Sequence, residues 1–192
     1  YNTHPAKMEH RSRTVVLFGS ERALAYFNDA QFRRLILFEK HSKEEQHRFF
    51  NELTVTNLVL LMLLIDQRIQ ETSEEDHREY LQALRAAVPE YYKGFLRRIR
   101  IPEERAVIWE KLIALRYDEY SKDMLEFRRR FLSEPDEKIN ELAMDNRVMI
   151  FQTVVLGLYN HLMRGKIKKG DPLSMNLQEY LVQIHKGFIK RI

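Results

Sequence analysis

The chain has 192 residues, 44% of them apolar, so it can bury one substantial core and predicts a single domain over residues 1–192. Only six glycines and five prolines are present, which leaves too few turn residues for a β-sandwich or barrel and predicts an all-α fold. Cysteine is absent, which excludes disulfides, thiolate metal ligands and cysteine nucleophiles and makes the cytoplasm the default location.

The net charge of +4 is concentrated at the two ends of the chain. Residues 1–13 carry three Lys/Arg against one acidic residue, residues 14–163 carry 22 against 25, and residues 164–192 carry seven against two. The polar, basic residues 1–13 predict a flexible arm and lack the apolar stretch of a secretory signal. Attraction to an anionic partner must therefore come from the ends rather than from the body.

Six segments show helical hydrophobic spacing, with acidic residues where they begin and basic residues where they end. This charge order complements the helix macrodipole and predicts a bundle of about six main helices. The segments cover residues 20–41, 42–72, 73–99, 102–132, 136–164 and 174–192. Ser20, Ser42 and Ser174 are suitable N-caps, and Pro89 is expected to kink or split the third segment.

Segments 42–72 and 136–164 are apolar on most faces, whereas the other four are amphipathic. We therefore expect these two to be the inner helices, surrounded by the rest. The longest apolar stretch, residues 53–65, is shorter than the roughly 20 residues that a bilayer span requires. It predicts a helix buried in protein rather than in a membrane.

Polar residues within the two apolar segments are candidate ligand-binding groups. Asn57 interrupts the apolar segment 42–72 and Gln152 interrupts the apolar segment 136–164, where Tyr159 ends the apolar part. Buried amides need hydrogen-bond partners, so Asn57 and Gln152 are expected to bond to each other, to the backbone or to water. The functional alternative is that the three residues orient a small apolar ligand between the inner helices.

Two Glu-x-x-His spacings, Glu44 with His47 and Glu74 with His77, match half of a di-metal carboxylate site. Each pair lies in the first turn of one of two consecutive helices, so the pairs should sit at opposite ends of a helix about 45 Å long. We expect the acidic residues to cap their helices and predict neither a metal site nor a cofactor. His161 follows the second apolar segment and is expected to interact with the helix end rather than with a haem.

The basic loop near the C-terminus is the candidate anion-binding site. It contains Arg164, Lys166, Lys168 and Lys169, and Asp171 alone opposes it. Such a loop can contact nucleic-acid phosphates or an anionic membrane. No aromatic residue stands among these cations to stack on bases, so only weak polyanion binding is expected.

Enzymatic function is disfavoured, because the chain has no Gly-x-Ser-x-Gly elbow and no glycine-rich phosphate loop. The leading hypothesis is a non-enzymatic helical interaction or regulatory module that binds a protein partner or self-associates. One alternative is a bundle that binds a small apolar ligand or a metal between its inner helices. The other is an anionic-surface binder that works through its basic C-terminal end.

Overall fold

The computed structural model describes residues 5–165 and 170–191. Within these residues the chain forms eight α-helices, one short 3₁₀ helix and no strand, which confirms the all-α class. The elements are α1 (Pro5–Phe27), α2 (Ala30–Leu35), η1 (Phe38–Lys40), α3 (Lys43–Glu71), α4 (Glu75–Arg98), α5 (Glu103–Leu132), α6 (Glu137–Met144), α7 (Asn146–Met163) and α8 (Pro172–Ile189).

Helix α3 is the centre of the molecule, as its apolar sequence predicts. Ser42 caps it by accepting a hydrogen bond from the Glu45 amide, and every residue from 52 to 65 is buried. It packs against α1, α4, α5, α7 and α8. Among the described residues it is the one helix long and apolar enough to cross a membrane, but 83% of its most apolar window is buried inside the protein. Burial among the neighbouring helices therefore explains why α3 is so apolar.

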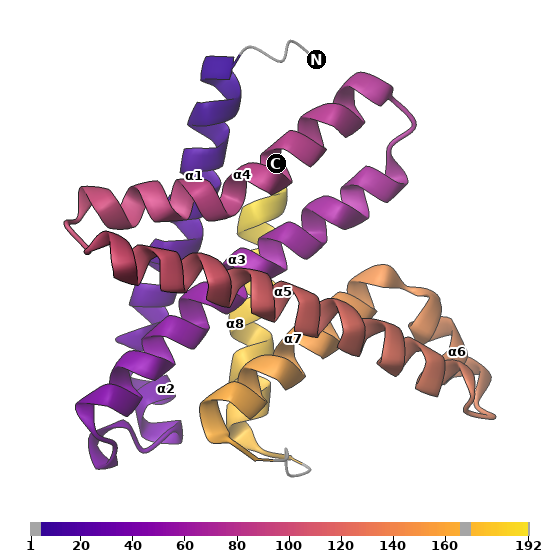
Figure 1. The fold of residues 1–192 in the computed structure, drawn as a ribbon. Coiled ribbons are helices and arrows are strands. Elements are labelled where there is room, and N and C mark those ends of the chain that lie inside the picture. The colour runs from indigo at the N-terminus through magenta and orange to yellow at the C-terminus, as the bar shows by residue number, and fades with distance from the viewer. Residues whose placement is uncertain (1–4, 166–169, 192) are drawn as a thin grey trace.

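Figure 1 shows α3 running diagonally through the molecule, with α5 crossing it near its middle. Helices α1 and α8 contact each other and lie together beyond α3, and α4 turns back across α1. The last turns of α5 extend to one side with α6 and α7 (Figure 1). One continuous cluster of buried apolar side chains joins all the helices except α6.

The predicted start of the first helix is wrong, because α1 begins at Pro5 and runs through Ser20. The Ser20 hydroxyl donates to the Val16 carbonyl one turn back, so it does not cap a new helix. Residues 5–13 of the expected flexible arm are helical, and Ser12 is fully buried. The chain breaks instead at Asp29, whose carboxylate accepts a hydrogen bond from the Phe32 amide and starts α2.

The expected inner helix 136–164 is two helices that meet at Asp145. Its carboxylate accepts from the amides of Arg147 and Val148, at 2.8 Å and 3.3 Å, and caps α7. One side of α7 contacts the core, but Gln152 is exposed and Leu156 is only half-buried. Helix α7 is therefore an amphipathic neighbour of α3 rather than a second inner helix.

The kink expected at Pro89 is present, whereas the start of the last helix differs from the sequence expectation. Helix α4 continues through Pro89 without splitting, and Figure 1 shows it bending near its middle, as a proline that removes a backbone donor requires. Helix α8 begins at Pro172, with the Asp171 carboxylate accepting from the Leu173 amide at 2.8 Å. Asp171, rather than Ser174, is therefore the cap.

Candidate functional site

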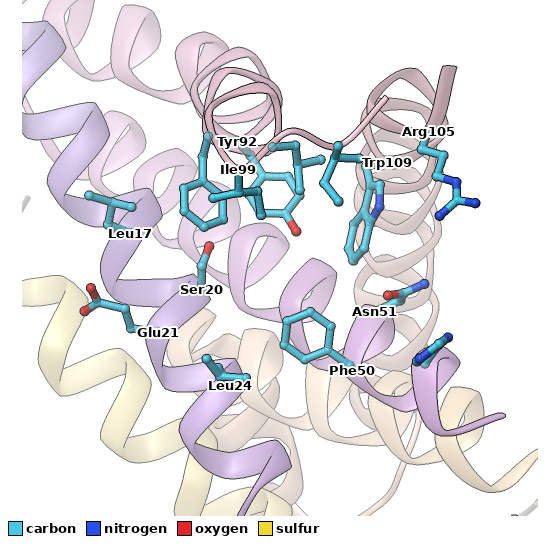
Figure 2. Close-up of a pocket in the computed structure, with 14 residues that line it drawn as sticks. Leu17, Ser20, Glu21, Leu24, Phe50, Asn51, Tyr92, Ile99, Arg105 and Trp109 are labelled. Carbon is cyan, nitrogen blue, oxygen red and sulfur yellow. The ribbon is translucent and has the colours of Figure 1, made fainter. Parts of the chain in front are cut away.

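The largest of the pockets described lies where α1 meets the start of α3, the end of α4 and the start of α5. Its volume is about 500 Å³. We call it the Trp109 pocket. Its lining comprises Leu17, Ser20, Glu21, Leu24, His47, Phe50, Asn51, Tyr92, Phe95, Leu96, Ile99, Ile101, Arg105 and Trp109. Figure 2 shows these side chains converging from four helices.

The walls of the Trp109 pocket are mainly aromatic and aliphatic. The Tyr92 ring packs edge-on against Trp109 with centroids 5.3 Å apart, and it also contacts Phe95 at 6.0 Å. At the mouth, Leu24 and Ile99 are 51% and 53% exposed. The pocket therefore presents apolar surface to solvent, which is typical of ligand-binding sites.

One buried polar group faces this apolar space without a partner. Tyr92 is only 2% exposed, and burial raises the pKa of its hydroxyl well above the ordinary value. The hydroxyl forms no hydrogen bond with any part of the chain that the structure describes. Figure 2 shows it pointing into the pocket. The hydroxyl oxygen itself is not one of the fully enclosed unpaired polar atoms of the described chain, so it is reached from the open pocket and can donate to or accept from a bound ligand.

The polar residues of the Trp109 pocket lie on its rim. Arg105 and Asn51 lie on one side and Glu21 on the other in Figure 2, and His47 belongs to the same turn of α3 as Asn51. Ser20 is the remaining polar group, and its hydroxyl is already used by the Val16 carbonyl at 2.9 Å. The arrangement suits binding, because it places a few polar groups around an apolar cavity and pairs no nucleophile with a base.

The three predicted ligand-binding residues do not converge. Asn57 is fully buried and donates to the Gly19 carbonyl at 2.9 Å and to the Tyr180 hydroxyl at 2.6 Å, so it ties α3 to α1 and α8. Gln152 is exposed on α7, so its expected burial is wrong, whereas Asn57 does bond to the backbone, one of its expected partners. Tyr159 donates to Asp171 at 2.6 Å, a bond that, together with burial, raises its pKa to about 12.

The predicted basic loop lies partly outside the described residues, which do not include Lys166, Lys168 or Lys169. Arg164 ends α7 in the left-handed conformation, with φ of 51°, and its guanidinium contacts Glu45 at 2.6 Å. This cation is therefore engaged by a carboxylate rather than held ready for a phosphate.

The two Glu-x-x-His pairs lie at the starts of α3 and α4, hence at opposite ends of α3. No group of three His, Asp or Glu side chains in residues 5–165 and 170–191 is placed to hold a metal ion.

An ion network that sequence analysis missed joins α3, α5 and α7. Arg116 donates two hydrogen bonds to Glu52, of 2.8 Å and 3.1 Å, and one to Glu119 at 2.9 Å. His161 Nε2 lies 3.1 Å from the other Glu119 oxygen, a close approach outside hydrogen-bond geometry. Burial and then the Arg116 charge hold the pKa of His161 below its ordinary value. Arg116 pairs with both carboxylates and links α3 to α5, so removing one partner would leave an unpaired charge at this helix crossing.

No family model, curated protein or solved structure matches the chain. The functional argument therefore rests on the geometry of the Trp109 pocket.

Proposed function

We propose that the protein is a non-enzymatic binding protein that takes a small, mainly apolar ligand in the Trp109 pocket. The observation that carries this proposal is the hydroxyl of the buried Tyr92 ring, which faces the pocket and has no hydrogen-bond partner in the described chain. A ligand that hydrogen-bonds to it gains the interaction without breaking one in the protein. This site lies between α1, α3, α4 and α5 rather than between the two segments that the sequence marks as inner.

The size and composition of the pocket support the proposal. A volume of about 500 Å³ falls in the range of small-molecule sites, roughly 300–1,000 Å³. Trp109, Tyr92 and Phe95 form an aromatic wall through mutual ring contacts. Such a wall offers a preformed apolar surface, so little ordering is needed on binding. The protein partner or self-association and the cytoplasmic location expected from the sequence stay predictions.

The chain offers a direct optical test, because Trp109 is its only tryptophan and lines the pocket. We expect the neutral dye N-phenylnaphthylamine to bind with energy transfer from Trp109. Leu24→Glu places a charge at the mouth and should weaken binding at least about tenfold, because bringing an apolar ligand against it desolvates the carboxylate. Leu142→Glu is the matched control, since Leu142 lies away from the pocket and is 50% exposed against 51% for Leu24. Equal affinities in the two variants would contradict the proposal.

A second variant separates ligand binding from folding. Tyr92→Phe removes a hydroxyl that makes no hydrogen bond in the described chain, so the free energy of unfolding should stay the same or rise slightly. Affinity for a ligand that bonds to this hydroxyl should fall roughly fivefold, the equivalent of one hydrogen bond of about 1 kcal/mol. Denaturant unfolding and isothermal calorimetry measure the two quantities. A destabilised variant with unchanged ligand affinity would assign the hydroxyl to folding.

A further inference from the structure

The rim of the Trp109 pocket is electrostatically one-sided. Arg105 and Asn51 lie on the side formed by α5 and α3, whereas Glu21 lies on the opposite side, on α1 (Figure 2). Neither the Arg105 guanidinium nor the Asn51 amide makes a hydrogen bond or ion pair with the described part of the chain. The α5 side therefore offers donors that the protein does not use.

We propose that the ligand is an anionic amphiphile, whose apolar body fills the Trp109 pocket and whose carboxylate or similar head group binds at Arg105. This inference rests on the proposed function and specifies the chemistry of the ligand. Arginine suits the role, because its planar guanidinium keeps its charge and donates two parallel hydrogen bonds to a carboxylate.

Two other cations near this rim, unlike Arg105, are already engaged by carboxylates. Lys93 contacts Glu110 at 2.9 Å, and Arg97 contacts Glu103 at 2.6 Å. These pairs occupy Glu103 and Glu110 of α5, and the adjacent Glu104 forms no ion pair with Arg105 in the described chain. An incoming anion therefore meets a guanidinium that no carboxylate of the described chain contacts.

The remaining polar groups fix the direction of the ligand. Glu21 repels an anionic head on the α1 side, so the head lies on the α5 side. The Tyr92 hydroxyl points into the space between these two rims in Figure 2. It is placed to donate to a polar atom of the ligand, while the chain of the ligand follows the apolar wall toward Leu24.

Three amphiphiles of equal chain length test the inference: decanoate, decanol and decyltrimethylammonium. Each competes with N-phenylnaphthylamine for the full chain. We expect decanoate to bind tightest, and its affinity to fall with added salt. Arg105→Gln should weaken decanoate about fivefold and leave decanol unchanged. Arg98→Gln is the control. Arg98 is an exposed arginine at the C-terminal end of α4, it does not line the pocket, and its replacement removes the same charge.

The outcomes separate the two proposals. If decanol or decyltrimethylammonium binds as tightly as decanoate, or if Arg105→Gln and Arg98→Gln act alike, the anionic ligand is refuted while the binding function stands. If neither the dye nor any of the three amphiphiles binds, the proposed function itself is refuted. Both arginine variants keep every buried contact, so a loss confined to decanoate in Arg105→Gln supports the inference.

Discussion

Replacing Asn57 with alanine should destabilise the fold strongly, because this side chain joins three helices in the core. It donates to the Gly19 carbonyl of α1 and to the Tyr180 hydroxyl of α8 while sitting on α3. Its own carbonyl oxygen, Oδ1, is buried and has no partner in the described chain. The side chain is thus held by its two donated bonds alone.

The magnitude follows from these contacts. Two lost hydrogen bonds cost about 1 kcal/mol each, and the cavity left behind costs about 1–2 kcal/mol more. Removing the unpaired Oδ1 returns about 1 kcal/mol, so we expect a net loss of about 2–3 kcal/mol. Urea unfolding measures it, with Asn160→Ala as control because Asn160 is exposed on a helix. A double-mutant cycle with Tyr180→Phe should give a coupling of about 1 kcal/mol. A loss below about 1 kcal/mol, or strict additivity, would refute the reasoning.

Three other perturbations have expected outcomes. Leu61→Ala in the centre of α3 should lower the free energy of unfolding by about 2–5 kcal/mol in urea titrations, because Leu61 is fully buried. Gly157→Ala should cost about 1–3 kcal/mol in the same assay, since the new Cβ would overlap the Tyr120 ring. A change under 0.5 kcal/mol, on the order of a surface substitution, would contradict either. The lowered pKa of His161 means that the unfolded chain binds this proton first, so stability is complete above about pH 6.5 and falls as pH drops below it. His161→Gln should flatten that fall in unfolding curves from neutral pH to about pH 5, and an unchanged slope would exclude His161 as its source.

The central helix was predictable because its signal is local and continuous. A mainly apolar stretch from Leu53 to Ile65, with a serine cap upstream, leaves few alternatives to a buried helix. The start of α1 was not predictable in this way. Serine is a common N-cap residue, but the Ser20 hydroxyl donates to the carbonyl of Val16 one turn earlier in the same helix. The neighbouring turn of that helix is buried against the core. Tertiary packing decides between these two uses of one serine.

The candidate site escaped sequence reasoning because its walls come from four segments distant in the sequence. Periodicity identifies the apolar face of each helix, but it does not show where four such faces leave a space between them and form a pocket. The same limit applies to the ion pair of Glu52 with Arg116, which depends on how α3 crosses α5. The predicted burial of Gln152 was wrong for a related reason. The sequence of an apolar segment that packs on the core with one side resembles that of a helix buried on all sides.

The order of the helices along the chain has a consequence for biosynthesis. Helix α3 is complete once Glu71 has left the ribosome, but α5, α7 and α8, which cover it, are translated later. At about 5–20 residues per second, its most apolar surface waits on the order of ten seconds for the last of them. During that time the apolar surface of α3 stays exposed on the nascent chain. We therefore expect α3 to be the main chaperone contact during synthesis, and translation stalled before α7 to yield aggregates.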